Sequence, residues 1–152
     1  MPRSEFHREL AVTAAPESTW QTLTDVPRLV GWVGIVEDAV ELDPLAHYTA
    51  VLMDRLGPFK LRADLDIVVS DVVPGESLRV RAEGEDRQVG SRLQIEATMA
   101  LAPHGSGTRV VFDGMYEVTG KVASMGSGTI NKKAEKIMGE FFAATQAELG
   151  AA

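Results

Sequence analysis

Cysteine is absent from the 152-residue sequence, which excludes disulfides, thiolate nucleophiles and metal sites built from cysteine. The three histidines, His7, His47 and His104, lie far apart in the chain, without the close spacing usual for metal ligands, so we expect no metal site. Acidic residues outnumber basic ones and give a net charge of −7. This charge argues against nucleic acid as a partner, because phosphate binding needs a basic surface.

Long hydrophobic runs and cofactor motifs are missing as well. No stretch approaches the ~18 consecutive apolar residues of a membrane span, and no signal peptide opens the chain, so we expect a cytoplasmic protein. The sequence contains no glycine-rich nucleotide-binding motif, no HExxH and no GxSxG. We therefore predict neither a cofactor nor a catalytic residue.

The sequence does contain a long series of strand-like segments. Residues 59–69 show the clearest alternation, with apolar side chains at every odd position and charged side chains at most even ones. This pattern is typical of an antiparallel sheet with one buried and one wet face. Seven strands are predicted, at residues 4–13, 36–42, 47–56, 59–69, 77–82, around 93–101 and 108–118, with turns that include Gly57-Pro58 and residues 84–88.

Two short helices are predicted between the first and second strands, one opening at Pro16 and one from Pro27 to Trp32. A long amphipathic helix of roughly 45 Å is predicted for Thr119–Leu149. Glycines weaken its first part, so we expect residues 134–149 to anchor it and Met125–Thr129 to act as a lid over a cavity. The predicted fold is α+β, one domain over residues 1–152, with a curved antiparallel sheet around the long helix.

Five motifs in this order resemble a known family. They are Ala15-Pro16-Glu17 with Trp20, Leu23 and Asp25; RLGPFK at 55–60; GTRV at 107–110; GKVA with Met125-Gly126 at 120–126; and Phe141-Phe142. Together they resemble the CoxG-like family of carbon monoxide dehydrogenase subunits, within the START/Bet v 1-like (SRPBCC) helix-grip superfamily. One departure is Val33-Gly34, where the family commonly has proline-glycine.

The resemblance implies an internal cavity for an apolar ligand and an accessory role around carbon monoxide dehydrogenase or related molybdenum hydroxylases. It also implies quinone-type lipids and peripheral contact with the inner face of the membrane. With almost no polar residues predicted to face inward, we expect a non-enzymatic protein that binds a lipid- or quinone-like molecule. Two alternatives stay open: a polyketide cyclase/aromatase-like enzyme, and a docking module without a ligand.

The candidate ligand-binding residues are Trp32, Tyr48, Leu52, Asp54, Phe59, Leu61, Met99, Phe112, Tyr116, Met125, Gly126, Thr129 and Ile130. Asp54 and Tyr116 would serve as acid or base in the enzyme alternative. Asp54 could instead turn to solvent at a bulge or pair with Arg55, and Tyr116 could simply pack in the core. Lysines 121, 132, 133 and 136 form either a contact face for an anionic membrane or acidic partner, or an ordinary solvated surface.

Overall fold

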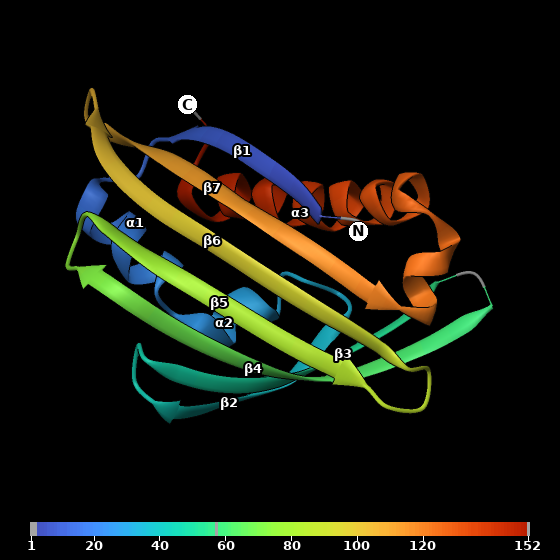
Figure 1. Cartoon of the computed structure of the whole chain (residues 1–152). Coiled ribbons are helices and arrows are strands. Elements are labelled where there is room, and N and C mark those ends of the chain that lie inside the picture. Colours follow the sequence, from blue (N-terminus) through green and yellow to red (C-terminus); the bar gives the residue numbers. More distant parts are fainter. Residues whose placement is uncertain (1–2, 57, 152) are drawn as a thin grey trace.

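One antiparallel sheet dominates the computed structural model, which describes residues 3–56 and 58–151. Within these residues seven strands pair in the order β1-β7-β6-β5-β4-β3-β2, so every strand except β1 lies beside its neighbour in sequence. The sheet curves around the long helix α3, and the two short helices α1 and α2 lie on the same side of it (Figure 1). This arrangement confirms the predicted fold class.

The strands and the helices α1, α2 and α3 agree with the sequence-based expectations in number and order, and one short helix, η1, was not expected. The strands are β1 (Arg3–Val12), β2 (Val36–Asp43), β3 (His47–Leu56), β4 (Phe59–Val73), β5 (Ser77–Asp86), β6 (Ser91–His104) and β7 (Gly107–Gly120). The helices are α1 (Pro16–Leu23), α2 (Val26–Val30), the short 3-10 helix η1 (Lys121–Met125) and α3 (Ser127–Leu149). Gly57 of the predicted Gly57-Pro58 turn lies outside the described residues.

The alternation predicted for β4 is confirmed. Ala63, Leu65 and Val69 are buried on the concave face, while Asp64 and Asp66 are exposed on the other. A period of two places successive side chains on opposite faces, so a single pattern both marks the strand and orients it toward the core.

The prediction of a turn at residues 84–88 is wrong, because β5 continues to Asp86. Gly84 stays in the strand because its missing side chain leaves room for Leu65, whose Cδ2 would lie 2.5 Å from an added Cβ. The chain turns after Asp86 instead. The Asp86 carboxylate accepts hydrogen bonds from the backbone N–H groups of Gln88 and Val89, at 2.9 and 3.0 Å, and from that of Arg62, at 2.7 Å.

We expect Asp86→Ala to lower the free energy of unfolding by about 2 kcal/mol at neutral pH, because three partly buried backbone N–H groups lose their acceptor. Burial works against ionisation, but the three N–H bonds outweigh it and hold the pKa of Asp86 below its ordinary value. The stabilisation is therefore present above the ordinary aspartate pKa of about 4 and is lost as pH falls through the lower folded value.

Urea unfolding at a series of pH values tests this prediction. The stability difference between the wild type and Asp86→Ala should narrow in acid, and the exposed neighbour Glu85 provides the control variant Glu85→Ala. A difference that stays constant down to the lowest pH would show that the Asp86 charge is not what stabilises the turn.

The long helix starts later than predicted. β7 runs on to Gly120, η1 follows, and α3 begins only at Ser127, so its 23 residues measure about 35 Å rather than 45 Å. Gly126, with φ 93° and ψ 151°, separates η1 from α3. This conformation is essentially restricted to glycine and cannot belong to a helix, so it breaks the continuous helix that the apolar spacing predicts.

The C-terminal end of α3 is fixed to the segment that follows β1. The backbone N–H groups of Thr13 and Ala14 donate to the carbonyls of Gly150 and Leu149, both at 2.9 Å, and the Leu149 side chain is buried. Nearby, the Phe112 ring of β7 packs against the rings of Phe141 and Phe142 in α3. These contacts agree with the prediction that the C-terminal half of the helix is its anchor.

Candidate functional site

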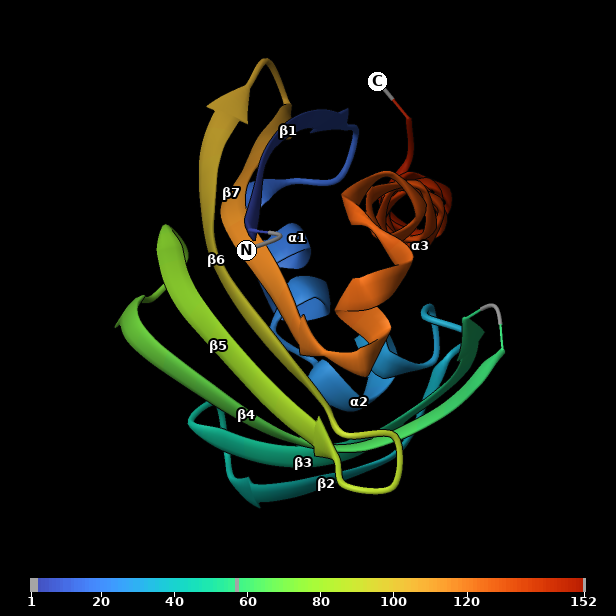
Figure 2. The same ribbon diagram turned by 45° about the vertical axis from the view of Figure 1, so that its right-hand side comes forward.

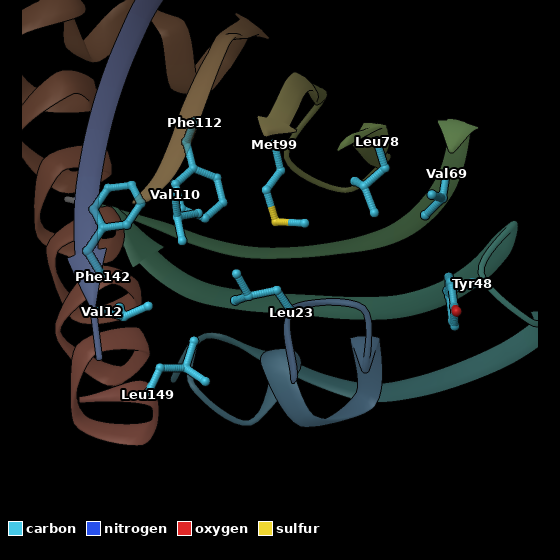
Figure 3. Packing of buried hydrophobic residues seen from close by; sticks show 10 residues of the cluster. All are labelled: Val12, Leu23, Tyr48, Val69, Leu78, Met99, Val110, Phe112, Phe142 and Leu149. Atoms are coloured by element: carbon cyan, nitrogen blue, oxygen red, sulfur yellow. The ribbon is translucent and has the colours of Figure 1, made fainter. Parts of the chain in front are cut away.

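A cavity of about 460 Å³ lies between the concave face of the sheet and the helices. Its wall takes residues from all seven strands and from α1, α2, η1 and α3, and it is almost entirely apolar. In Figure 3, Met99 and Leu78 project from the sheet on the side where Leu23 of α1 lies. The view in Figure 2, nearly along α3, shows the helix on the inner side of the curved sheet.

Part of the predicted ligand-binding set lies in this wall. The residues concerned are Leu52, Asp54, Leu61, Met99, Phe112, Tyr116 and Ile130. They come from β3, β4, β6, β7 and α3, so elements distant in sequence meet around one space. Their contact with a ligand is part of the proposal made below.

Trp32, Tyr48 and Phe59 lie outside the wall. The Trp32 ring packs against Phe141, with ring centroids 5.9 Å apart. Tyr48 is buried in the core, and its hydroxyl accepts a hydrogen bond of 2.7 Å from the backbone N–H of Leu45. Burial raises the pKa of this hydroxyl, as expected for a group held in the neutral form. Phe59 opens β4 beside the β3–β4 turn, at the end of the strand pair rather than along the cavity.

Met125, Gly126 and Thr129 also lie outside the wall, although Val122 before them and Ile130 after them belong to it. Thr129 is exposed, and the contribution of α3 begins at Ile130 and continues to Phe142. The physical reason is the break at Gly126, which ends η1 and restarts the helix, so that the inward face begins one turn later. A gating motion of this segment stays a prediction.

Asp54 faces the cavity, and its side chain is 13% exposed. The β3–β4 pairing runs without interruption through Asp54 and Leu61, so no bulge turns the carboxylate outward. Its Oδ2 lies 3.1 Å from Nζ of Lys133, and its Oδ1 accepts a 2.8 Å hydrogen bond from the backbone N–H of Arg55. The partner of Asp54 is thus a lysine of α3 rather than the Arg55 side chain.

Lys133 is the functional candidate that sequence reasoning missed, because it was grouped with the other lysines. Lys121, Lys132 and Lys136 are exposed, whereas Lys133 lines the cavity and its side chain is only 28% exposed. A signal existed in its spacing. Lys133 stands three residues after Ile130 and four before Ile137, within the apolar stripe of the helix.

Tyr116 also connects the sheet to the helix. Its hydroxyl donates a 2.6 Å hydrogen bond to Oδ1 of Asn131, and the Ser4 hydroxyl donates to the same oxygen at 2.6 Å. The Tyr116 ring is buried, as its core-packing alternative requires, yet it also lines the cavity. The N-terminal half of α3 is thereby held by polar contacts, in contrast to its aromatic C-terminal half.

The chemistry available at the wall is limited. Asp54 is engaged by Lys133, and the Tyr116 proton is directed to Asn131. Across residues 3–56 and 58–151, no group of three or more histidine, aspartate or glutamate side chains is placed to hold a metal ion. None of the helices in this part of the chain is long and apolar enough to cross a membrane.

Known structures share this architecture. A conserved protein from Geobacillus kaustophilus superposes with a TM-score of 0.81 at 23% identity, over 97% of this chain and 94% of that one. Ara h 8.0201 matches with a TM-score of 0.60 at 8% identity over 95% and 99% of the two chains, which identifies a Bet v 1-like helix-grip fold. The di-domain aromatase/cyclase StfQ of the steffimycin biosynthetic pathway gives 0.66 at 11% identity, over 97% of this chain and 50% of that one.

A search of curated proteins finds no match to this sequence. A family model, in contrast, matches residues 9–150, from the end of β1 through the last residue of α3 and Gly150. The match therefore includes nearly every residue that shapes the cavity. The chain belongs to the CoxG family of carbon monoxide dehydrogenase subunits.

Proposed function

We propose that this protein binds a hydrophobic, lipid- or quinone-like molecule in the cavity beneath α3 and catalyses no reaction itself. The observation that carries the proposal is the cavity: about 460 Å³ with an almost wholly apolar wall. Ligand sites typically measure about 300–1,000 Å³ and combine an apolar lining with a few polar groups that orient the ligand. Among the polar residues of the wall, we assign this orienting role to Asp54, Lys133 and Tyr116.

The accessory role rests on the family. Carbon monoxide dehydrogenase is named in the family's own description, so we propose that the bound molecule serves a dehydrogenase of that type, a molybdenum hydroxylase. The exposed lysines Lys121, Lys132 and Lys136 offer a surface for peripheral contact with an anionic membrane. In a host that carries both proteins, deletion of this chain should abolish carbon monoxide-dependent respiration and leave the dehydrogenase active in extracts. Unchanged respiration would contradict the accessory role.

Native mass spectrometry of protein purified from its own host tests the binding proposal. We expect a hydrophobic small molecule to leave the protein only on denaturation, because its apolar body is held by burial. If the ligand is lost during purification, quinones and lipids are added to the empty protein, and their binding is measured in the same way. Protein that is empty as isolated and takes up none of these compounds would contradict the proposal.

The cyclase alternative makes a different prediction for the same residues. If the wall catalyses ring closure, Asp54→Asn and Tyr116→Phe should abolish turnover of an aromatic polyketide substrate. We expect the wild-type protein to show no such turnover. Turnover that either substitution abolishes would support the enzyme over the binding protein.

A further inference from the structure

A single ion pair is set into the apolar wall of the cavity. Asp54 extends from the end of β3 and Lys133 from the second turn of α3, with Oδ2 and Nζ 3.1 Å apart. Around them lie the apolar side chains of Leu52 and Leu61 on the sheet and Ile130 on the helix, all in the same wall. The pair therefore bridges the sheet and the helix at the cavity surface.

The exposure of the two side chains places the pair where the cavity approaches solvent. The Asp54 side chain is 13% exposed and that of Lys133 is 28% exposed, whereas Met99 and Phe112 farther along the wall are buried. Removing charges from water is costly, and a pair of this kind seldom adds much stability compared with apolar residues of similar size. Fold stability alone is thus a weak reason for a lysine within the apolar stripe of α3.

The Asp54–Lys133 pair retains hydrogen-bond donors that a ligand could use. A lysine ammonium has three N–H donors, and among the described residues Asp54 is the partner recorded for Lys133. Asp54 already accepts from the Arg55 backbone through its other oxygen. The group best able to receive a ligand is therefore the Lys133 ammonium, which offers donors to an acceptor atom on a molecule inside the cavity.

The charge of the pair determines which acceptor fits. Asp54 balances Lys133, so a neutral acceptor such as a carbonyl binds without leaving a net charge in the apolar wall. A carboxylate would compete with Asp54 for the ammonium and add an uncompensated negative charge. Arg92, the remaining charged residue of the wall, is exposed and does not alter this balance inside.

We infer that Lys133, held by Asp54, binds the polar end of the ligand and selects a neutral carbonyl acceptor over a carboxylate; this inference rests on the proposed function. The ligand then lies with its acceptor at the Asp54–Lys133 pair and its apolar body toward Met99 and Phe112. Lys133 acts as the contact residue, and Asp54 acts as the positioning residue that sets the charge preference.

Three probes of matched shape test this inference by isothermal titration calorimetry: hexyl-naphthoquinone, hexyl-naphthalene and hexyl-naphthoic acid. They share rings and tail and carry carbonyls, no acceptor and a carboxylate, respectively. We expect the wild type to prefer the quinone over the naphthalene by about tenfold, the worth of one hydrogen bond to a charged donor. Lys133→Met should lose that preference and keep its affinity for the naphthalene.

The variant Asp54→Asn gives the more specific test of charge selection, because it leaves the Lys133 ammonium without its counter-charge. In this variant, the affinity for the naphthoate relative to that for the quinone should rise by about tenfold or more over the wild-type ratio. The double variant Asp54→Asn/Lys133→Met carries no unpaired charge and should prefer neither polar probe, which guards against misfolding of a single variant. Lys132→Met, at an exposed neighbouring position, is the matched control and should bind all three probes like the wild type.

The outcomes separate this inference from the proposed function. Wild-type protein that binds the naphthalene and the quinone equally, or binds the naphthoate more tightly than the quinone, overturns the inference and leaves the apolar binding function standing. A preference for the quinone that survives in Lys133→Met overturns it as well. Wild-type protein that binds none of the three overturns the proposed function and this inference together.

Discussion

Ala97→Phe is expected to lose at least about tenfold in affinity for a hydrophobic ligand while the protein stays folded. Ala97 lies in β6 with its side chain on the cavity wall, and it is only half-buried although its strand has a neighbouring strand on each side. The added ring would project into the space that a ligand needs. Because that space is open, filling it should not cost the stability that overpacking a dense core costs.

The matched control is Ala100→Phe, three residues along the same strand. Ala100 is exposed and faces away from the cavity, so the same substitution there should leave binding unchanged. Calorimetric titration with a naphthoquinone or lipid probe and a thermal unfolding curve distinguish loss of the site from loss of the fold. Wild-type affinity in a folded Ala97→Phe protein would place the ligand outside this cavity.

Gly120→Ala is the substitution from which we expect the largest loss of stability, at least about 3 kcal/mol. Gly120 ends β7 with φ 88° and ψ −154°, a conformation that side chains other than glycine rarely adopt. An added Cβ would also lie 2.0 Å from the backbone carbonyl oxygen of Gly90. Both the strained backbone and the displaced β5–β6 turn raise the energy of the folded state.

Gly139→Ala gives the opposite expectation with the same chemical change. Gly139 lies within α3, and an added Cβ there would meet no atom within 4 Å. Alanine should therefore stabilise the helix by about 0.5–1 kcal/mol. Denaturant unfolding of both variants measures the difference in their free energies of unfolding. A Gly120→Ala protein as stable as the wild type would show that the backbone at the end of β7 can rearrange without cost.

The two ends of α3 are held by different kinds of contact, and this difference bears on how a ligand could enter. Toward the C-terminus, Phe142 and Leu149 are buried and the backbone is bonded to Thr13 and Ala14. Toward the N-terminus, Ile130 is buried, and the polar contacts are the Asn131 hydrogen bonds and the Asp54–Lys133 pair. Polar contacts near solvent exchange for water at little cost, so the N-terminal end is where we predict opening.

Local pattern was sufficient to predict most of the sheet. The alternation in β4 identifies both the strand and its buried face, because a strand side chain has only two directions available. The same reasoning placed Leu52, Leu61 and Met99 on the face of the sheet that forms the cavity wall. It did less well at β5, where Gly84 looked like a turn residue and instead makes room for Leu65 of the neighbouring strand.

Helical pattern was a poorer guide, because a helix face is continuous and its partner decides which residues turn inward. Trp32 was expected to end the second short helix and to line the cavity, yet α2 ends at Val30 and the Trp32 ring packs on Phe141. Lys133 was expected with the surface lysines, yet its stem lies in the apolar stripe and its charge meets Asp54, which stands 79 positions earlier in the chain (133 minus 54). Nothing local to either residue indicates that pairing.

The sequence by itself determined the seven strands, the three main helices, their order and the apolar character of the interior. It did so because hydrophobic periodicity and turn residues act over short distances along the chain. Only the tertiary structure decided where α3 begins and which polar groups reach the cavity. The break at Gly126 and the meeting of Asp54 with Lys133 depend on how the curved sheet and the helix are brought together, a relation between residues far apart in sequence.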